Sequence, residues 1–327
     1  MANRPDRRAS VPDQVLGAQP PRQRRMRPSW WARREISRAD LALVLRLTAV
    51  SLVGALLFLA VYWLAVRTSR GQTLGNAALA GQRVVLARGA RGAERILESL
   101  GVVSLAAGTL VLMAVALVRG RPRLALVTAL TVFGSLLVSE LMKQVILERP
   151  DLVGSPTYPR HNSFPSGHAT AAAAVAAGLV MVAPHRARGK VGIVGAVYAA
   201  GVAYSTLFSG WHRPSDVAGS AAIVLAVSAA AAGVLVWWRG SHRTRDVESQ
   251  VGSPLAAVAL TSAGLVLILA GFLGLTGPLE ALGSGLPFSE PLEDASFIAM
   301  STVGVGVSFL STALLVLGLH GVQFDPP

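Results

Sequence analysis

Residues 165–183 read PSGHATAAAAVAAGLVMVA, an apolar run of small residues that opens with proline, serine, glycine and histidine. The run approaches the roughly 20 residues that an α-helix needs to cross a bilayer. Proline fits the first turn of a helix, where no amide hydrogen bond is lost. The stretch therefore predicts a membrane-spanning helix, and the residues at its mouth need their own explanation.

Comparable apolar runs recur from position 41 to near the C-terminus, and 52% of the 327 residues are hydrophobic. We expect an all-α integral membrane protein with about eight transmembrane helices. The predicted spans are 41–66, 99–118, 124–146, 165–183, 191–209, 215–238, 254–275 and 295–319. The chain has no cysteine, which excludes disulfides and thiolate chemistry.

The formal charge of +13 reflects arginine in the N-terminal tail and in short loops. Residues 1–40 lack apolar periodicity and are predicted to form a disordered tail. An even number of predicted spans separates the tail from each of the basic loops 118–123, 185–190 and 239–245. These loops and the tail therefore share one side of the membrane. The positive-inside rule makes that side cytoplasmic and predicts a multi-pass plasma-membrane protein, with a composition that favours a bacterial source. Membrane lipids, and not nucleic acid, then explain the charge.

Segment 67–98 is an exception, since it carries several arginines and the count of spans places it outside. Two interpretations stay open for it. It forms an amphipathic helix at the membrane interface, or it is a solvated helical loop.

The third span ends in the first polar group, LMKQVILERPD, which contains Lys143 and Arg149. Taken alone, such cations at a span end snorkel to the interface. Glu140 lies one turn before Lys143, and pairing with one of these cations is its simplest interpretation.

The second polar group lies at the start of the fourth predicted span, 165–183. The amides of Ser166, Gly167 and His168 are expected among the first-turn donors that have no partner inside the helix. Such amides form an anion site, and His168 can supply a proton. The alternative is an ordinary capped helix start with a surface histidine.

The third group is SGWHRPSDVAG, residues 209–219. Pro214 starts a helix with Asp216 in its first turn, where negative charge is favoured. His212 lies four residues before Asp216, so imidazole and carboxylate can touch and one ring nitrogen stays free to attack. The alternative is a capping aspartate beside an incidental histidine.

All three groups fall at span ends on the outer face, and unrelated capping residues have no reason to converge there. Two cations, helix-start amides and two histidines, one beside a carboxylate, predict a site for phosphoryl transfer.

These residues resemble the type 2 phosphatidic acid phosphatase superfamily, which also includes bacterial lipid phosphatases and vanadium haloperoxidases. The family pattern is Lys, six residues and Arg-Pro; then Pro-Ser-Gly-His; then Ser-Arg, five residues, His, three residues and Asp. The resemblance covers Lys143 to Asp216, with PSGH at 165–168 and HRPSD at 212–216.

The resemblance implies a role for each residue. His212 would attack phosphorus, His168 would protonate the leaving oxygen, and Asp216 would orient His212. The phosphate oxygens would be held by Lys143, Arg149, Ser166 and Gly167. No metal or other cofactor is expected.

Two positions depart from the family pattern. Five residues separate Lys143 from Arg149, which predicts that Arg149 lies past the helix end, where the loop can re-aim it. The Ser-Arg pair aligns with Ser205 and Thr206, so the family arginine is absent. The candidates to replace its charge are Arg213 and Arg160.

The expected activity is hydrolysis of a lipid phosphate or pyrophosphate, from an isoprenoid carrier or a glycerophospholipid, on the outer leaflet through a phosphohistidine. Two alternatives stay open: phosphoryl transfer to an alcohol acceptor, and a non-catalytic protein that binds phospholipid or scaffolds an envelope complex. The expected organisation is the tail, a six-helix phosphatase-like core over 41–238, and two further helices within 239–327. For these two helices, docking of an envelope protein or formation of a homo-oligomer is left open.

Overall fold

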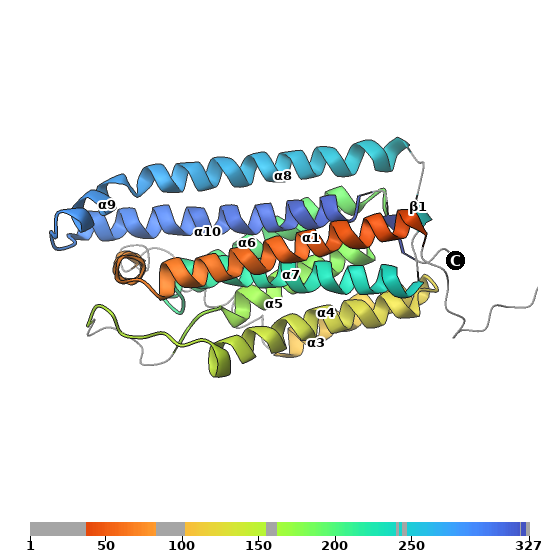
Figure 1. The fold of residues 1–327 in the computed structure, drawn as a ribbon, viewed down its shortest axis with the longest axis horizontal. Coiled ribbons are helices and arrows are strands. Elements are labelled where there is room, and N and C mark those ends of the chain that lie inside the picture. Colours follow the sequence, from red (N-terminus) through yellow and green to blue (C-terminus); the bar gives the residue numbers. More distant parts are fainter. Residues whose placement is uncertain are drawn as a thin grey trace, which may run out of the picture. The chain divides into compact units, whose positions relative to one another are not determined.

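The structure, a computed structural model, describes residues 37–82, 102–154, 162–239, 242–243, 247–320 and 322–324 (Figure 1). The helices are α1 (Arg38–Val61), α3 (Val102–Val118), α4 (Pro122–Leu141), α5 (Gly167–Val182), α6 (Arg188–Phe208), α7 (Pro214–Arg239), α8 (Val247–Gly274), α9 (Thr276–Gly283) and α10 (Glu290–Gly318). The π-helical turns η1 (Tyr62–Val66) and η2 (Met142–Ile146) extend α1 and α4, and residues 69–82 are also helical. The short strands β1 (His242–Arg243) and β2 (Val322–Gln323) pair antiparallel. Of the predicted tail 1–40, residues 1–36 lie outside the described residues.

Long apolar helices dominate the described chain. Those long and apolar enough to cross a membrane are Arg38–Val66, Pro122–Ile146, Arg188–Phe208, Pro214–Trp238, Pro254–Gly283 and Glu290–Gly318. Two shorter apolar helices, Ala107–Val118 and Gly167–Val182, occupy the other two predicted spans. The all-α membrane fold is confirmed, whereas the number of eight spans stays a prediction because two of these helices are short.

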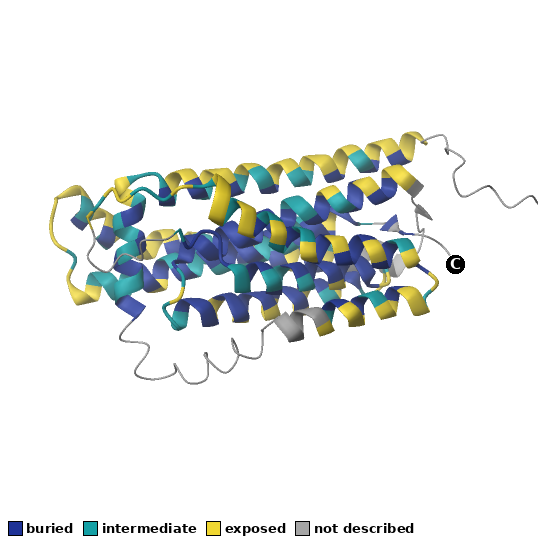
Figure 2. Cartoon of the chain, turned by 90° about the horizontal axis from the view of Figure 1, so that it is seen from below, coloured by how far each residue is buried: buried dark blue, intermediate teal, exposed yellow. Residues whose placement is uncertain are grey.

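Helix α7 occupies the middle of the bundle. Within its most apolar stretch of 18 residues, 72% is buried. The corresponding share is 22% for the segment that contains α1 and 28% for the segment that contains α8. Figure 2 shows buried residues gathered on the inner sides of the long helices and exposed ones on their outer sides. A Cβ on Gly54 of α1 would lie 2.7 Å from the amide nitrogen of Ala226 in α7. Small residues thus let the backbones approach closely, as is typical of membrane helices.

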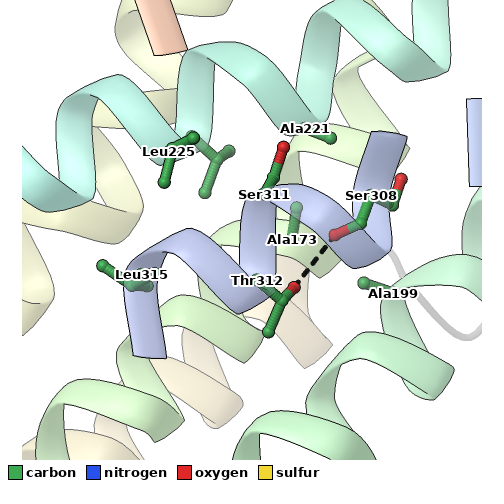
Figure 3. Close-up of a pocket in the computed structure, with 9 residues that line it drawn as sticks. Ala173, Ala199, Ala221, Leu225, Ser308, Ser311, Thr312 and Leu315 are labelled. Atoms are coloured by element: carbon green, nitrogen blue, oxygen red, sulfur yellow. Dashed lines mark hydrogen bonds between the residues drawn. The ribbon is translucent and has the colours of Figure 1, made fainter. Parts of the chain in front are cut away.

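The C-terminal helix α10 belongs to the same compact unit as the other described helices. It contacts α6, α7 and α8. A small cavity of about 20 Å³ lies where Ser311 and Thr312 of α10 face Ala173, Ala199 and Ala221 of α5, α6 and α7 (Figure 3). Helix α10 therefore forms part of the bundle interior together with the core helices.

The predicted basic loops gather at one end of the bundle. Arg119 donates to the carbonyl of Val182 at the end of α5, over 2.8 Å. Arg188 is buried and donates to the carbonyls of Leu319 and Val322, over 2.7 and 2.8 Å. Pairing of β1 with β2 joins the end of α7 to the same place. The starts of α5 and α7 lie at the opposite end (Figure 1).

Candidate active site

The three predicted polar groups come together where α4 finishes and α5 and α7 begin (Figure 1). His212 Nδ1 lies 3.3 Å from Asp216 Oδ2, and Arg149 Nη1 lies 3.8 Å from Asp216 Oδ1. Lys143 Nζ lies 3.8 Å from the point that a Cβ on Gly167 would occupy. Residues far apart in the sequence therefore form one cluster.

His168 belongs to this cluster. Its ring centroid lies 5.4 Å from that of Trp211, the residue that precedes His212. His212 and Lys143 both lie near enough to act on its charge. The two histidines therefore lie at the same end of the bundle, as the sequence predicts.

Asp216 is completely buried in the first turn of α7. Its Oδ2 accepts from the backbone amide of Arg213 over 3.1 Å and faces the ring of His212. Its Oδ1 accepts from the hydroxyl of Ser215 over 3.4 Å. With Nδ1 of His212 turned to the carboxylate, Nε2 is the ring nitrogen left for chemistry.

The start of α5 is tied to the start of α7 through Ser166. The Ser166 amide donates to the Asp216 carbonyl over 3.2 Å, and the Ser166 carbonyl accepts from the hydroxyl of Ser220 over 2.8 Å. Its own hydroxyl caps α5 by accepting from the amide of Ala169 over 3.4 Å. The Ser166 amide has no partner inside its own helix, as expected, but it is not open to a ligand, because the Asp216 carbonyl of α7 accepts from it. The amides of Gly167 and His168 have no partner within the helix.

Phe164 anchors this stretch in the bundle. Its ring packs 5.2 Å from Phe58 and 5.8 Å from Tyr62, and its peptide bond to Pro165 is cis. A Cβ on Gly219 of α7 would lie 2.4 Å from the Phe164 ring. Glycine at 219 therefore makes room for the aromatic anchor.

Arg149 lies past the end of η2, as its spacing from Lys143 predicts. The loop that carries it is held at three points. The Tyr62 hydroxyl donates to the Glu148 carbonyl over 2.8 Å, Gln72 Nε2 to the Pro150 carbonyl over 2.6 Å, and Asn162 Nδ2 to the Leu147 carbonyl over 3.1 Å. The Arg149 side chain is only 1% exposed and reaches Asp216. A rigid loop thus re-aims this cation after the helix has ended.

Lys143 forms an ion pair with Glu140, with 2.8 Å between Nζ and Oε1. This confirms the expected partner of Glu140. The Lys143 side chain is 13% exposed and that of Glu140 is 49% exposed. The carboxylate is more exposed than the ammonium, so the lysine is the inner member of the pair.

The residues considered as accessory to the site are Ser205, Arg213 and Arg160, together with Thr206 at the place of the family arginine. Ser205 and Thr206 donate their hydroxyls to carbonyls of their own helix, those of Gly201 and Ala203. Arg213 is buried, and both Nε and Nη2 donate to one oxygen of Asn76. Arg160 lies outside the described residues.

The contacts of the helix at 69–82 with the site are what the sequence did not reveal. Figure 1 shows this helix nearly along its own axis, so it runs across the ends of the long helices. Its buried residues include Gln72, Ala78 and Gln82, which excludes the solvated-loop interpretation for this part. Most of the amphipathic pattern in segment 67–98 lies beyond it, outside the described residues. The sequence does contain a signal for these contacts, namely the amide side chains of Gln72, Asn76 and Gln82 among small residues.

The described part of the chain contains no group of three or more His, Asp or Glu side chains that could hold a metal ion. The cluster instead combines cations, helix-start amides and two imidazoles. These groups can bind an anion, attack it and move a proton.

Residues 102–245 match the model of the PAP2 superfamily. The match covers α3 to α7 and includes each of the three polar groups. Helix α1, the helix at 69–82 and helices α8 to α10 lie outside it. No curated protein and no solved structure matches the chain.

Proposed function

Since the segment 102–245 belongs to the PAP2 superfamily of phosphatases, we propose that this multi-pass membrane protein hydrolyses a lipid phosphate or pyrophosphate without a metal. The observation that carries the proposal is the contact of His212 with the buried Asp216, with a second histidine and two cations at the same end of the bundle.

The first half of the reaction forms a covalent intermediate. Nε2 of His212 attacks phosphorus, and the bond between phosphorus and the lipid oxygen breaks. Protonated His168 gives its proton to that leaving oxygen. Asp216 holds the ring of His212 and stabilises the positive charge that develops on it.

The second half releases phosphate. Water attacks the phosphohistidine, and neutral His168 accepts the proton of that water. The phosphorus–nitrogen bond breaks, which restores His212 and frees inorganic phosphate. His168 is left protonated for the next cycle.

The surrounding groups stabilise charge on the phosphoryl oxygens. In this proposal Arg149, Lys143 and the Gly167 amide contact these oxygens directly. The Ser166 hydroxyl is buried and caps α5, so its contribution is to place the amides at the helix start. Ser205 has no comparable role, because its hydroxyl bonds Gly201.

The position of the site favours a lipid substrate. Its residues lie at helix ends, so a head group there can keep its chain in the hydrocarbon. Trp211 beside His168 is 47% exposed, and such indole rings favour the membrane interface. Both isoprenoid carriers and glycerophospholipids offer this chemistry, and we place the site on the outer leaflet because the basic loops lie at the other end.

The test is phosphate release from a panel of lipid phosphates and pyrophosphates by purified protein in detergent. We expect His212→Ala to abolish release and His320→Gln, at the opposite end of the bundle, to retain it. Substrate labelled on the transferred phosphoryl group should label wild-type protein transiently in an acid-labile form. Full activity of His212→Ala refutes the mechanism.

The same assay separates the two alternatives. A labelled lipid product with an added alcohol, in place of free phosphate, indicates a phosphotransferase. Binding of the lipid phosphate without release of phosphate indicates a non-catalytic protein, an outcome motivated by Thr206 at the place of the family arginine.

A further inference from the structure

The ion pair between Glu140 and Lys143 lies against the start of α5 as well as on its own helix. Oε1 of Glu140 lies 3.4 Å, and Nζ of Lys143 lies 3.8 Å, from the point that a Cβ on Gly167 would occupy. A Cβ points toward the N-terminus of its helix, so that point lies beside the opening turn of α5. The carboxylate and the ammonium therefore share the space that glycine leaves open next to the helix-start amides.

Two contacts hold this part of the chain against α5. The hydroxyl of Thr170 donates to the hydroxyl of Ser139, the residue before Glu140, over 3.3 Å. Nδ2 of Asn162, in the loop that leads into α5, donates to the Lys143 carbonyl over 3.4 Å. The backbone that carries the ion pair is thus tied to the start of α5 on both sides of the pair.

This place is the one that the proposed reaction gives to the phosphoryl oxygens, since the Lys143 ammonium and the Gly167 amide are their donors. A carboxylate accepts hydrogen bonds from the same kinds of donor, and a helix start favours carboxylates as it does phosphates. Two anions so close together also repel each other. Glu140 therefore lies where its carboxylate competes with phosphate for Lys143.

The exposure of the pair indicates that a substrate can displace the carboxylate. The Glu140 side chain is 49% exposed, and ion pairs this open to water contribute little to stability. The carboxylate can turn into water, whereas Lys143, at 13% exposed, is the inner group. Competition lowers the affinity for every phosphate, but a lipid substrate keeps the binding contributed by its chain. Inorganic phosphate has no chain, so it is released more readily.

We propose that Glu140 competes with phosphate for Lys143, so that its carboxylate gives way to the lipid substrate and promotes release of inorganic phosphate after the reaction. The inference rests on the proposed phosphatase function. It makes Glu140 a determinant of phosphate affinity, a role that its pairing with a cation does not by itself require.

The test uses Glu140→Gln, which keeps the shape of the side chain and removes its charge. We expect the inhibition constant of inorganic phosphate against lipid phosphate hydrolysis to fall at least about fivefold, because a like charge close to the phosphate is removed. The rise in melting temperature that inorganic phosphate causes in detergent should become larger. Glu148→Gln is the matched control, since it removes the same charge from an exposed side chain in the following loop and should leave both values near those of wild type.

Two other results overturn the inference. If Glu140 serves to hold Lys143 in position, its loss raises the inhibition constant of phosphate and the KM for the lipid. If the pair is only a surface contact, Glu140→Gln behaves as Glu148→Gln does. Glu140→Ala, which leaves no group to bond Lys143, decides between the same outcomes if the glutamine variant does not fold.

The two measurements also separate this inference from the proposed function. A wild-type protein that releases no phosphate from any substrate on the panel defeats the proposed function. The melting temperature needs no turnover, so it still shows whether loss of the Glu140 charge strengthens the binding of inorganic phosphate.

Discussion

Nδ1 of His212 lies 3.3 Å from Oδ2 of Asp216, and this carboxylate is completely buried at the start of α7. The same Oδ2 accepts the amide of Arg213, so the carboxylate holds both the ring and the backbone next to it. Because Asp216 lies in the first turn of α7, the start of this helix sets the orientation of the His212 ring. Each prediction below changes one contact that keeps this arrangement in place.

Asp216→Asn should lower turnover at least about 100-fold, because an amide does not hold the required tautomer of the His212 ring or stabilise its positive charge. Phosphate release measures the effect. The matched control is Asp151→Asn, since Asp151 is exposed and accepts the Gly154 amide in a loop turn, a bond that asparagine can also make. Equal losses in both variants would speak against a special role for Asp216.

Gln72→Ala should raise the KM for the lipid phosphate about tenfold, because the loop that aims Arg149 loses its contacts at Pro150 and Leu152. Leaving these backbone groups unpaired should also cost about 1–3 kcal/mol of stability. Gln144→Ala serves as control, since Gln144 is exposed in η2. The prediction fails if the two variants have the same KM.

Local rules made much of this molecule predictable. Apolar length marked the helices, proline and serine marked the start of α5, and the spacing of His212 and Asp216 placed two side chains one turn apart. The position of Arg149 also followed from its spacing, because a helix cannot carry it on the same face as Lys143.

A helix within segment 67–98 was expected, but the contribution of residues 69–82 to the site escaped prediction for a physical reason. The inner face of this helix consists of amides and small residues, such as Gln72, Asn76 and Ala78, which gives no apolar stripe. Its partners are carbonyls and a guanidinium on loops distant in sequence, so its role depends on tertiary packing. The acceptor of the Ser166 amide depends on tertiary packing as well, since it is the Asp216 carbonyl on another helix.

Gly219→Ala should destabilise the protein by about 1–3 kcal/mol, because the added Cβ would lie 2.4 Å from the Phe164 ring in a packed interior. A displaced Phe164 also moves the start of α5, so activity should fall with stability. Gly201→Ala is the control, since nothing lies within 4 Å of a Cβ there and alanine favours a helix. Melting temperatures in detergent should drop for the first variant and stay level or rise for the second.

The orientation of the site can be tested cleanly because the chain has no cysteine. Ser289→Cys places a thiol at the exposed start of α10, at the end of the bundle where the site lies, and Arg186→Cys places one in the basic loop at the other end. We expect a membrane-impermeant maleimide to label position 289 in intact cells and position 186 only after permeabilisation, since arginine-rich loops stay in the cytoplasm. The cysteine-free parent measures background labelling. The reverse pattern would place the site in the cytoplasm and remove the outer-leaflet substrate from the proposal, while the phosphoryl-transfer chemistry would stand.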